Sequence, residues 1–122
     1  MKLFSRRNVL THAVAAVSAT ALGQKLIVAA QAHGSPTTHI VEIQNFKFSP
    51  DDLTAHVEDT ITWINKDIAP HTATAKDKRW DTGVLKQGES KSLVVTDAMA
   101  GGYGCTFHTM MKAKLVVENC MK

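Results

Sequence analysis

Short runs of alternating apolar and polar residues, separated by turn-forming residues, fill the chain beyond its N-terminal region. Residues 60–65 show the pattern: Ile61 and Trp63 alternate with Thr60 and Thr62, so the two faces of an extended strand differ in polarity. The region has no convincing 3.6-residue period of the kind that amphipathic helices show. The pattern therefore predicts an all-β fold, a Greek-key β-sandwich of about seven or eight strands.

Seven segments are predicted as strands, each bounded by residues such as Gly, Pro, Asn and Asp that favour turns. The segments are residues 38–43, 53–57, 60–65, 72–75, 91–95, 102–106 and 113–118. We expect them to form one domain, residues 38–122, preceded by a flexible lead, residues 33–37, that contains Gly34-Ser35-Pro36. A domain of this size has room for one modest two-layer core.

The first 32 residues have the composition of an export signal. Lys2 and the Arg6-Arg7 pair precede an apolar, alanine-rich stretch, and Ala30-Gln31-Ala32 has the small-x-small form of a cleavage site. The arginine pair also resembles a twin-arginine signal. An uncleaved anchor fits less well, because Gln24-Lys25 interrupts the apolar run before the ~20 residues that a spanning helix needs. We expect residues 1–32 to be removed, leaving a periplasmic domain without stable membrane association.

Removal of this leader changes the charge of the protein. The whole chain has 14 Lys and Arg against 11 Asp and Glu, a net charge of +3. Four of the basic residues and none of the acidic ones lie in the leader, so the domain that remains is close to neutral. A domain without a basic face gives no support to a nucleic-acid-binding function.

Four side chains could bind a metal ion, three of them near the C-terminal end of the chain and one in its middle. Cys105, His108 and Met111 are spaced as Cys-x₂-His-x₂-Met, and His71 follows Pro70 upstream. Thiolate and thioether favour Cu(I) while imidazole binds both oxidation states, which is the donor set of an electron-transfer copper site with a His₂Cys plane and an axial Met. Structural zinc sites usually contain a C-x₂₋₄-C pair, which is missing here.

Strand phase distinguishes the two neighbouring methionines. Along the last predicted strand, Leu115 and Val117 belong to the apolar phase, and Met111 continues it toward the N-terminal side. Met110 falls in phase with Lys112 and is expected to point outward. Met111 is therefore the predicted axial ligand.

Other interpretations of these residues stay open. Cys105 with a histidine base would make a nucleophile, although a third orienting group and a glycine-rich oxyanion loop are not evident. Cys105 and Cys120 would form a disulfide if neither binds metal, since exported domains favour disulfides. Copper delivery or storage would use the same four ligands. An oxidative enzyme would instead bind copper at the mature N-terminus through His33, with His39 or His56 nearby.

Four further motifs cover nearly the whole domain. They are Phe48-x-Pro50, TITWINKD at 60–67, Pro70-His71-Thr72 and YGCTFH at 103–108. With the short Cys-x₂-His-x₂-Met spacing, they resemble those of small cupredoxins, nearest to the amicyanin and plastocyanin group. The resemblance implies a cupredoxin-like fold and an electron carrier that is not an enzyme. It implies one copper ion, cycling between Cu(I) and Cu(II), with the ligands His71, Cys105, His108 and Met111.

Three positions depart from the pattern of that group. Glu58 stands where a glycine is common, so the geometry of that turn is expected to change. Thr72 replaces an asparagine, and its hydroxyl is expected to reach Thr106 and tie the two ligand loops together. Phe107 replaces a proline, so its N–H is free to donate a hydrogen bond to the Cys105 sulfur. Such a bond is expected to raise the reduction potential above that of a proline-bearing relative.

The resemblance also implies a route for the electron. In cupredoxins the second histidine ligand reaches the surface through an apolar patch, here formed by residues near His108, namely Phe107, Met110, Ile68, Ala69 and Pro70. Patches of this kind suit transient contacts of small area. The expected partners of this monomeric domain are redox proteins such as a c-type cytochrome or a periplasmic dehydrogenase.

Overall fold

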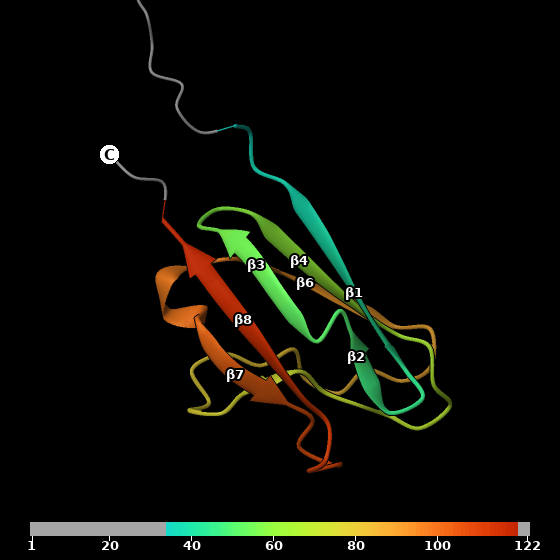
Figure 1. Ribbon diagram of the computed structural model, residues 1–122. Coiled ribbons are helices and arrows are strands. Elements are labelled where there is room, and N and C mark those ends of the chain that lie inside the picture. The colour runs from blue at the N-terminus through green and yellow to red at the C-terminus, as the bar shows by residue number, and fades with distance from the viewer. Residues whose placement is uncertain (1–33, 120–122) are drawn as a thin grey trace, which may run out of the picture. The chain divides into compact units, whose positions relative to one another are not determined.

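The structure is a computed structural model, which describes residues 34–119 of the chain. These residues form a sandwich of two four-stranded sheets, one with the strand order β2-β1-β4-β6 and the other with the order β3-β8-β7-β5 (Figure 1). The elements are β1 (Thr38–Gln44), β2 (Lys47–Ser49), β3 (Asp52–His56), β4 (Thr60–Asn65), β5 (Thr74–Ala75), β6 (Ser90–Val94), the 3₁₀ helix η1 (Asp97–Met99), β7 (Gly101–Gly104) and β8 (Lys112–Glu118). The predicted all-β sandwich is confirmed.

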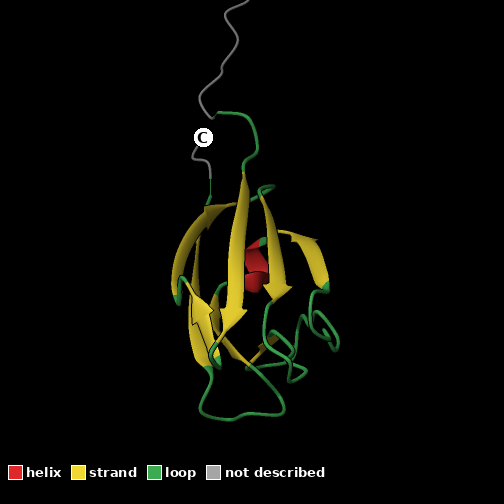
Figure 2. Ribbon diagram, turned by 90° about the vertical axis from the view of Figure 1, so that its right-hand side faces the viewer, coloured by secondary structure: helices red, strands yellow, loops and turns green. Residues whose placement is uncertain are grey.

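Between β2 and β7, each strand lies in the opposite sheet from the strand before it. Every connection in this part of the chain therefore crosses from one sheet to the other. β1 pairs with β4 in parallel, and β3 pairs with β8 in parallel, whereas the remaining neighbours are antiparallel. Long loops gather at one end of the sandwich (Figure 2). Parallel neighbours far apart in the sequence require such crossing connections, since a short hairpin joins only antiparallel strands.

The strand positions differ from the sequence prediction in three places. β2 was missed because it has only three residues, too few to show a period of two. β5 is confined to Thr74–Ala75, shorter than the predicted 72–75, because the backbones of Thr72 and Ala73 bond to Cys105 Sγ and to Thr82 instead of to a neighbouring strand. β7 spans Gly101–Gly104, so Cys105 and Thr106 of the predicted segment 102–106 lie beyond the end of the strand. Asp97–Met99 forms one turn of 3₁₀ helix, in a stretch for which no element was predicted.

The core lies between the sheets and follows the predicted alternation. In β4, Ile61, Trp63 and Asn65 are fully buried, while the residues between them are half-buried. The Trp63 indole stacks on Trp80 with ring centroids 5.3 Å apart and donates a hydrogen bond from Nε1 to the Tyr103 hydroxyl at 3.4 Å. Burial of aromatic side chains gives a small core much of its stabilisation.

The predicted phase of the last strand is confirmed. Leu115 is buried in β8 and Val117 packs against the core, whereas Lys112 is exposed. Met111 is 2% exposed and Met110 is 73% exposed. The two methionines therefore lie on opposite sides of the chain, as the alternation requires.

Glu58 adopts a left-handed backbone conformation, with φ of 83°. This is a region that glycine adopts freely and other residues rarely adopt, so the turn is one in which a glycine would fit without strain. A left-handed conformation costs a non-glycine residue about 1–2 kcal/mol. The turn is nevertheless held in place, because the Glu58 N–H donates to the Val95 carbonyl at 2.9 Å.

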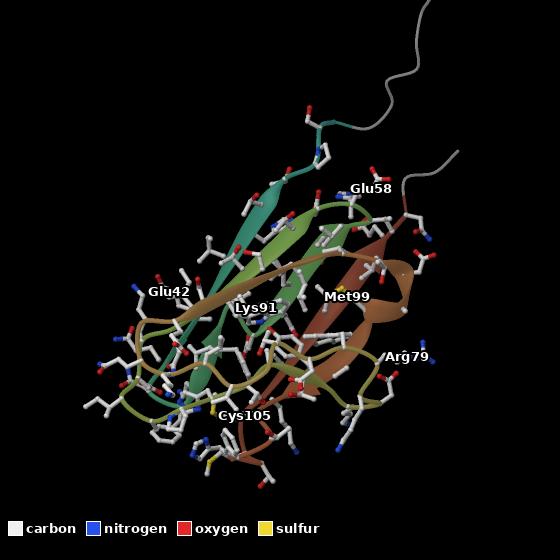
Figure 3. The ribbon with its side chains drawn as sticks, turned by 180° about the vertical axis from the view of Figure 1, so that it is seen from behind. Glu42, Glu58, Arg79, Lys91, Met99 and Cys105 are labelled. Atoms are coloured by element: carbon white, nitrogen blue, oxygen red, sulfur yellow. The ribbon has the colours of Figure 1, made fainter. Side chains whose placement is uncertain are left out.

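The neighbouring Asp59 lies buried at the Glu58 end of the sandwich, opposite the end that carries Cys105 (Figure 3). Its carboxylate accepts hydrogen bonds from the Thr37 N–H at 2.8 Å and the His56 N–H at 2.9 Å, and contacts His39 Nε2 at 2.8 Å. Burial alone would raise the pKa of Asp59. The hydrogen bonds from His56, Thr37 and His39, with the charge of His39, outweigh burial and lower this pKa from 3.8 to about 2.

We predict that Asp59→Asn destabilises the domain at neutral pH and much less in acid. A folded-state pKa of about 2 against an ordinary 3.8 corresponds to about 2 kcal/mol of stability. This contribution is present above the ordinary pKa and is lost as the pH falls through the folded-state value. Urea unfolding of the copper-free protein between neutral pH and pH ~2.5 measures it, with the exposed Asp52→Asn as control. A destabilisation that stays constant over this range would contradict the prediction.

Several parts of the sequence prediction lie outside the described residues. They are the export signal at residues 1–32, the first residue of the lead, His33, and the second cysteine, Cys120. Residues 34–37 precede β1 and are exposed. Within residues 34–119, no helix is long and apolar enough to cross a membrane.

Candidate metal centre

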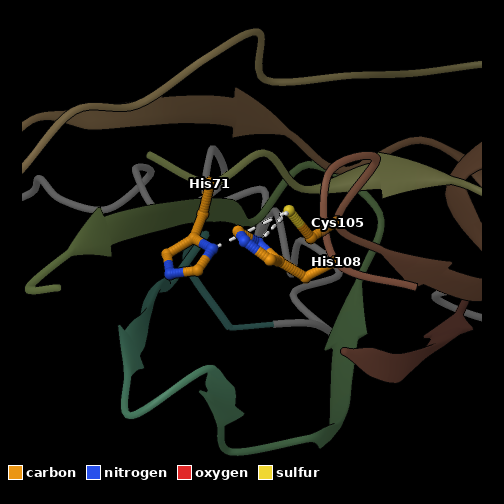
Figure 4. Close-up of side chains that lie close together, drawn as sticks. All are labelled: His71, Cys105 and His108. Carbon is orange, nitrogen blue, oxygen red and sulfur yellow. Dashed lines mark hydrogen bonds between the residues drawn. The ribbon is translucent and has the colours of Figure 1, made fainter. Parts of the chain in front are cut away.

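Three predicted ligands meet at the end of the sandwich where the long loops gather (Figure 4). His71 lies in the loop between β4 and β5, where its backbone exchanges hydrogen bonds of 3.1 and 2.8 Å with Leu85. Cys105 directly follows β7, and His108 lies in the turn that leads to β8. The Cys105 Sγ is 3.8 Å from His71 Nδ1 and 3.6 Å from His108 Nδ1.

These separations fit one shared metal ion. For a first-row metal such as zinc, bonds of about 2.0–2.1 Å to nitrogen and about 2.3 Å to sulfur, at trigonal angles, would place the donors about 3.7–3.8 Å apart. The two separations from the Cys105 sulfur therefore need almost no change to accommodate a shared ion. Among the His, Cys, Asp and Glu residues of the described chain, no fourth donor joins this group. One thiolate and two imidazoles without a fourth strong ligand fit copper better than structural zinc.

The three donors differ in their access to solvent. His71 is fully buried and Cys105 is 6% exposed, while His108 is half-buried. Cys105 is a free cysteine among the described residues. Contact with solvent at the centre is therefore concentrated at the His108 imidazole.

Met111 lies close to these donors in the chain and is buried in the same core cluster as Cys105. Two backbone hydrogen bonds close the loop: Met111 N–H donates to the His108 carbonyl at 2.9 Å, and Cys105 N–H donates to the Met111 carbonyl at 3.4 Å. The loop is thus a tight turn that begins and ends at a predicted ligand. Coordination by the Met111 sulfur remains a prediction.

Two backbone N–H groups point at the Cys105 sulfur. The Thr72 N–H and the Phe107 N–H each donate to Sγ at 3.4 Å. The second bond is the one predicted from the replacement of proline by Phe107, and it is confirmed. Hydrogen bonds of this kind withdraw charge from a thiolate, which is a recognised control on the potential of such sites.

The side of His71 that faces away from Cys105 is held by a carboxylate. His71 Nε2 lies 2.8 Å from Asp67 Oδ2, and the Asp67 carboxylate also accepts the N–H groups of Asn45 at 2.7 Å and Phe46 at 2.9 Å. Burial acts to raise the pKa of Asp67, but the hydrogen bonds from Phe46, Asn45 and His71 keep it below 3.8. A proton held at Nε2 leaves the Nδ1 lone pair directed at the metal position.

Phe46 covers both imidazoles edge-on. Its ring centroid lies 5.0 Å from that of His71 and 4.7 Å from that of His108, with interplanar angles of 87° and 84°. Asn45 and Phe46 form the two-residue turn between β1 and β2, with φ of 54° and 58°. A bulky residue rarely adopts positive φ, so the packing against the imidazoles helps to hold it there.

Sequence reasoning missed the roles of Phe46 and Asp67. The position of Phe46 depends on the pairing of β1 with β2, and β2 was not predicted. Asp67 entered the prediction only as the last residue of the motif at 60–67, although its place four residues before His71 was a usable signal.

The surface around His108 is apolar. Four exposed side chains contribute to it: Ile68 is 83% exposed, Met110 73%, Phe107 51% and Phe46 42%. A shallow hollow next to His71 is lined by Phe46, Ile68 and Ala69, together with the polar Lys66, Asp67 and Gln87. Phe107, Met110 and Ile68, three residues of the predicted patch, are exposed.

The chain is similar to known proteins both in sequence and in structure. The family model described as Cupredoxin-like domain matches residues 12–117. The amicyanin of Paracoccus denitrificans is 32% identical over 84 residues, which cover 65% of this chain and 64% of that protein. The amicyanin-alpha of Methylorubrum extorquens is 30% identical over 112 residues, which cover 87% of this chain and 93% of that protein.

Solved amicyanin structures agree with these sequence matches. A Cu(I) form of one amicyanin mutant is 32% identical with a TM-score of 0.58, covering 75% of this chain and 87% of that chain. The oxidized state of another mutant is 33% identical with a TM-score of 0.58, covering 66% and 82%. A matching family model, a relative aligned over nearly its full length and a sandwich whose end gathers a thiolate and two imidazoles agree: this chain belongs to the cupredoxin-like family.

Proposed function

We propose that this protein is a single-electron carrier with one type 1 copper site, bound by His71, Cys105, His108 and Met111. The observation that carries this proposal is the convergence of the Cys105 thiolate and two imidazole nitrogens at 3.6 and 3.8 Å. Copper, when bound, supplies the one-electron chemistry of the Cu(II)/Cu(I) couple. The amicyanin relatives and the Cu(I) and oxidized amicyanin structures support the same function.

The contribution of the protein is a donor set that is held in place. Asp67 fixes one side of His71, and two backbone hydrogen bonds close the loop that carries Cys105. Donors held in this way move little between oxidation states, which favours fast electron transfer. Because the polar groups around the donors are already in place, they do not have to reorient when the electron is transferred, as water molecules would.

The half-buried His108 is the proposed exit for the electron. Its ring centroid lies 6.3 Å from that of the exposed Phe107, and the proposed contact surface comprises Phe107, Met110, Ile68, Ala69 and Pro70. Such a surface suits brief contacts with a redox protein, for which a c-type cytochrome or a periplasmic dehydrogenase is proposed. The protein would act as a monomer in the periplasm.

Copper loading tests the proposed function. The purified protein should bind one Cu(II) per chain, show an intense thiolate-to-copper band in the visible spectrum and undergo reversible one-electron reduction. The absence of this band would contradict the proposal. Retention of copper against a chelator separates a carrier from a delivery protein: with His71 and Cys105 buried, release should be slow in both oxidation states.

We predict that Phe107→Pro lowers the reduction potential. The substitution removes the N–H that donates to Cys105 Sγ at 3.4 Å. One hydrogen bond worth about 1 kcal/mol corresponds to about 40 mV for a one-electron couple. Voltammetry measures the shift, and Phe107→Ala, which keeps the N–H, serves as the control. An unchanged or higher potential in the proline variant would contradict the prediction.

A further inference from the structure

A chain of hydroxyl groups runs from a surface carboxylate to the loop that carries Cys105. Thr74 Oγ1 donates to Asp81 Oδ1 at 2.7 Å, and Thr72 Oγ1 lies 2.9 Å from Thr74 Oγ1. Thr72 Oγ1 in turn accepts the Thr106 N–H at 3.0 Å and lies 3.3 Å from the Thr106 hydroxyl. The contact between Thr72 and Thr106 confirms the one predicted from the sequence, but its extension to Asp81 was not predicted.

The direction of this chain follows from its end at Asp81. A carboxylate only accepts hydrogen bonds, so the single hydroxyl proton of Thr74 is directed at Asp81. Thr72 must then donate its own proton to Thr74, which leaves the lone pairs of Thr72 Oγ1 free to accept from Thr106. Every hydroxyl between the carboxylate and the Cys105 loop therefore has one defined orientation.

Burial makes this orientation costly to change. Thr72 is 3% exposed and Thr74 is 7% exposed. A buried hydroxyl that loses its partner pays the full cost of its desolvation, and hydrogen bonds in series strengthen one another in a medium of low dielectric. Asp81, in contrast, lies at the surface and accepts the Gly83 N–H at 3.0 Å, which holds its carboxylate in position.

At the end away from Asp81, the chain of hydroxyl groups meets both segments that donate hydrogen bonds to the Cys105 sulfur. Thr72 supplies one of them through its own backbone N–H, and Thr106 precedes Phe107, which supplies the other. Thr72 and Thr106 are joined by their side-chain contact, so the chain fixes the two N–H donors relative to each other. A change at Asp81 or Thr74 is thus transmitted to the thiolate without any direct contact.

We propose that Asp81, acting through Thr74 and Thr72, is a positioning residue for the copper centre and sets the strength of the two N–H···S hydrogen bonds. The effect on the reduction potential rests on the proposed function of the site. The geometry of the chain itself does not, because all of its members are protein groups.

The first test compares Thr74→Val with Thr74→Ser. Valine removes the hydroxyl with little change of shape, and serine restores it. In copper-free protein, amide exchange at Thr106 should accelerate about fivefold in the valine variant, the factor that one neutral hydrogen bond provides, and should return in the serine variant. In copper-loaded protein the potential should fall in Thr74→Val and recover in Thr74→Ser. Equal behaviour of the two variants in both measurements would overturn the proposal.

The second test separates the hydrogen bond from the charge. Asp81→Ala should reproduce the effects of Thr74→Val. Asp77→Ala removes the same charge from a neighbouring turn, where the Asp77 carboxylate bonds the side chain and the backbone N–H of Arg79, and should leave Thr106 exchange unchanged. Equal potential shifts in Asp81→Ala and Asp77→Ala would overturn the proposal. Absence of the thiolate-to-copper band in the wild-type protein would instead contradict the proposed function. The rates of amide exchange at Thr106 would still test the chain of hydroxyl groups.

Discussion

Cys105→Ser abolishes the intense visible band of the copper-loaded protein. The band requires a thiolate that donates charge to copper, and Cys105 Sγ is the only sulfur among the three convergent donors. A serine hydroxyl is harder and less charge-donating, so Cu(I) loses its strongest soft ligand. The expected result is complete loss of the band and a Cu(II) EPR spectrum of an ordinary tetragonal site, with weaker retention of Cu(I).

The second cysteine of the chain provides a matched control. Cys120→Ser removes a thiol from the same protein and should leave the band and the potential unchanged. Loss of the band in Cys120→Ser would show that the wrong cysteine has been assigned. Since serine is close to cysteine in size, unfolding of the two copper-free variants shows whether the fold is retained in each.

Much of the centre could be predicted from the sequence, because two of its three convergent donors are close together in the chain. Cys105 and His108 lie in the loop that leads to Met111, and the alternation of β8 decides that Met111, the proposed fourth ligand, points inward. The missing proline at Phe107 likewise implies an N–H close to the sulfur two residues earlier. In each case, covalent geometry and a period of two limit the positions that a side chain can occupy.

The parts that were missed depend on contacts between distant segments. Phe46 reaches the imidazoles because a three-residue strand pairs with β1. Asp81 reaches Thr74 through an isolated bridge between β5 and the loop that follows it, which has no periodic signal. The sandwich brings these residues together, and composition and spacing alone do not specify such pairings.

The structure also explains why a polar network is tolerated in so small a core. Asn65 is fully buried in β4, and its amide donates to the Ala69 carbonyl at 2.9 Å and the Leu85 carbonyl at 2.8 Å. Its side-chain oxygen accepts the Asp67 N–H at 2.8 Å. One buried amide therefore fixes three points of the loops around His71, and each of its hydrogen-bonding groups has a partner.

Gly104→Ala is expected to destabilise the domain strongly and to disturb the metal centre. Gly104 lies in β7, between Lys112 of β8 and Thr74 of β5. A Cβ at this position would overlap the backbone carbonyl oxygen of Met111, which cannot rotate away as a side chain can. The same oxygen accepts the Cys105 N–H, so relief of the overlap must move Met111, Cys105 or both.

Gly102→Ala, in the same strand, separates this overlap from the general effect of the substitution. A Cβ at Gly102 would meet only ordinary contacts, the nearest being the flexible Lys76 side chain at 3.5 Å. We expect a loss of about 3 kcal/mol or more for Gly104→Ala, against less than about 1 kcal/mol for Gly102→Ala. In a domain of this size, the larger value lowers the melting temperature by roughly 10–20 °C.

Thermal unfolding of the two copper-free variants measures this difference, and copper spectra report on the centre. Because the overlap acts on the loop between two proposed ligands, Gly104→Ala should also shift the thiolate-to-copper band, whereas Gly102→Ala should not. Equal stability of the two variants would show that the Met111 carbonyl yields without cost. In that case the close approach of β7 to the loop would not be what holds the donors of the centre in place.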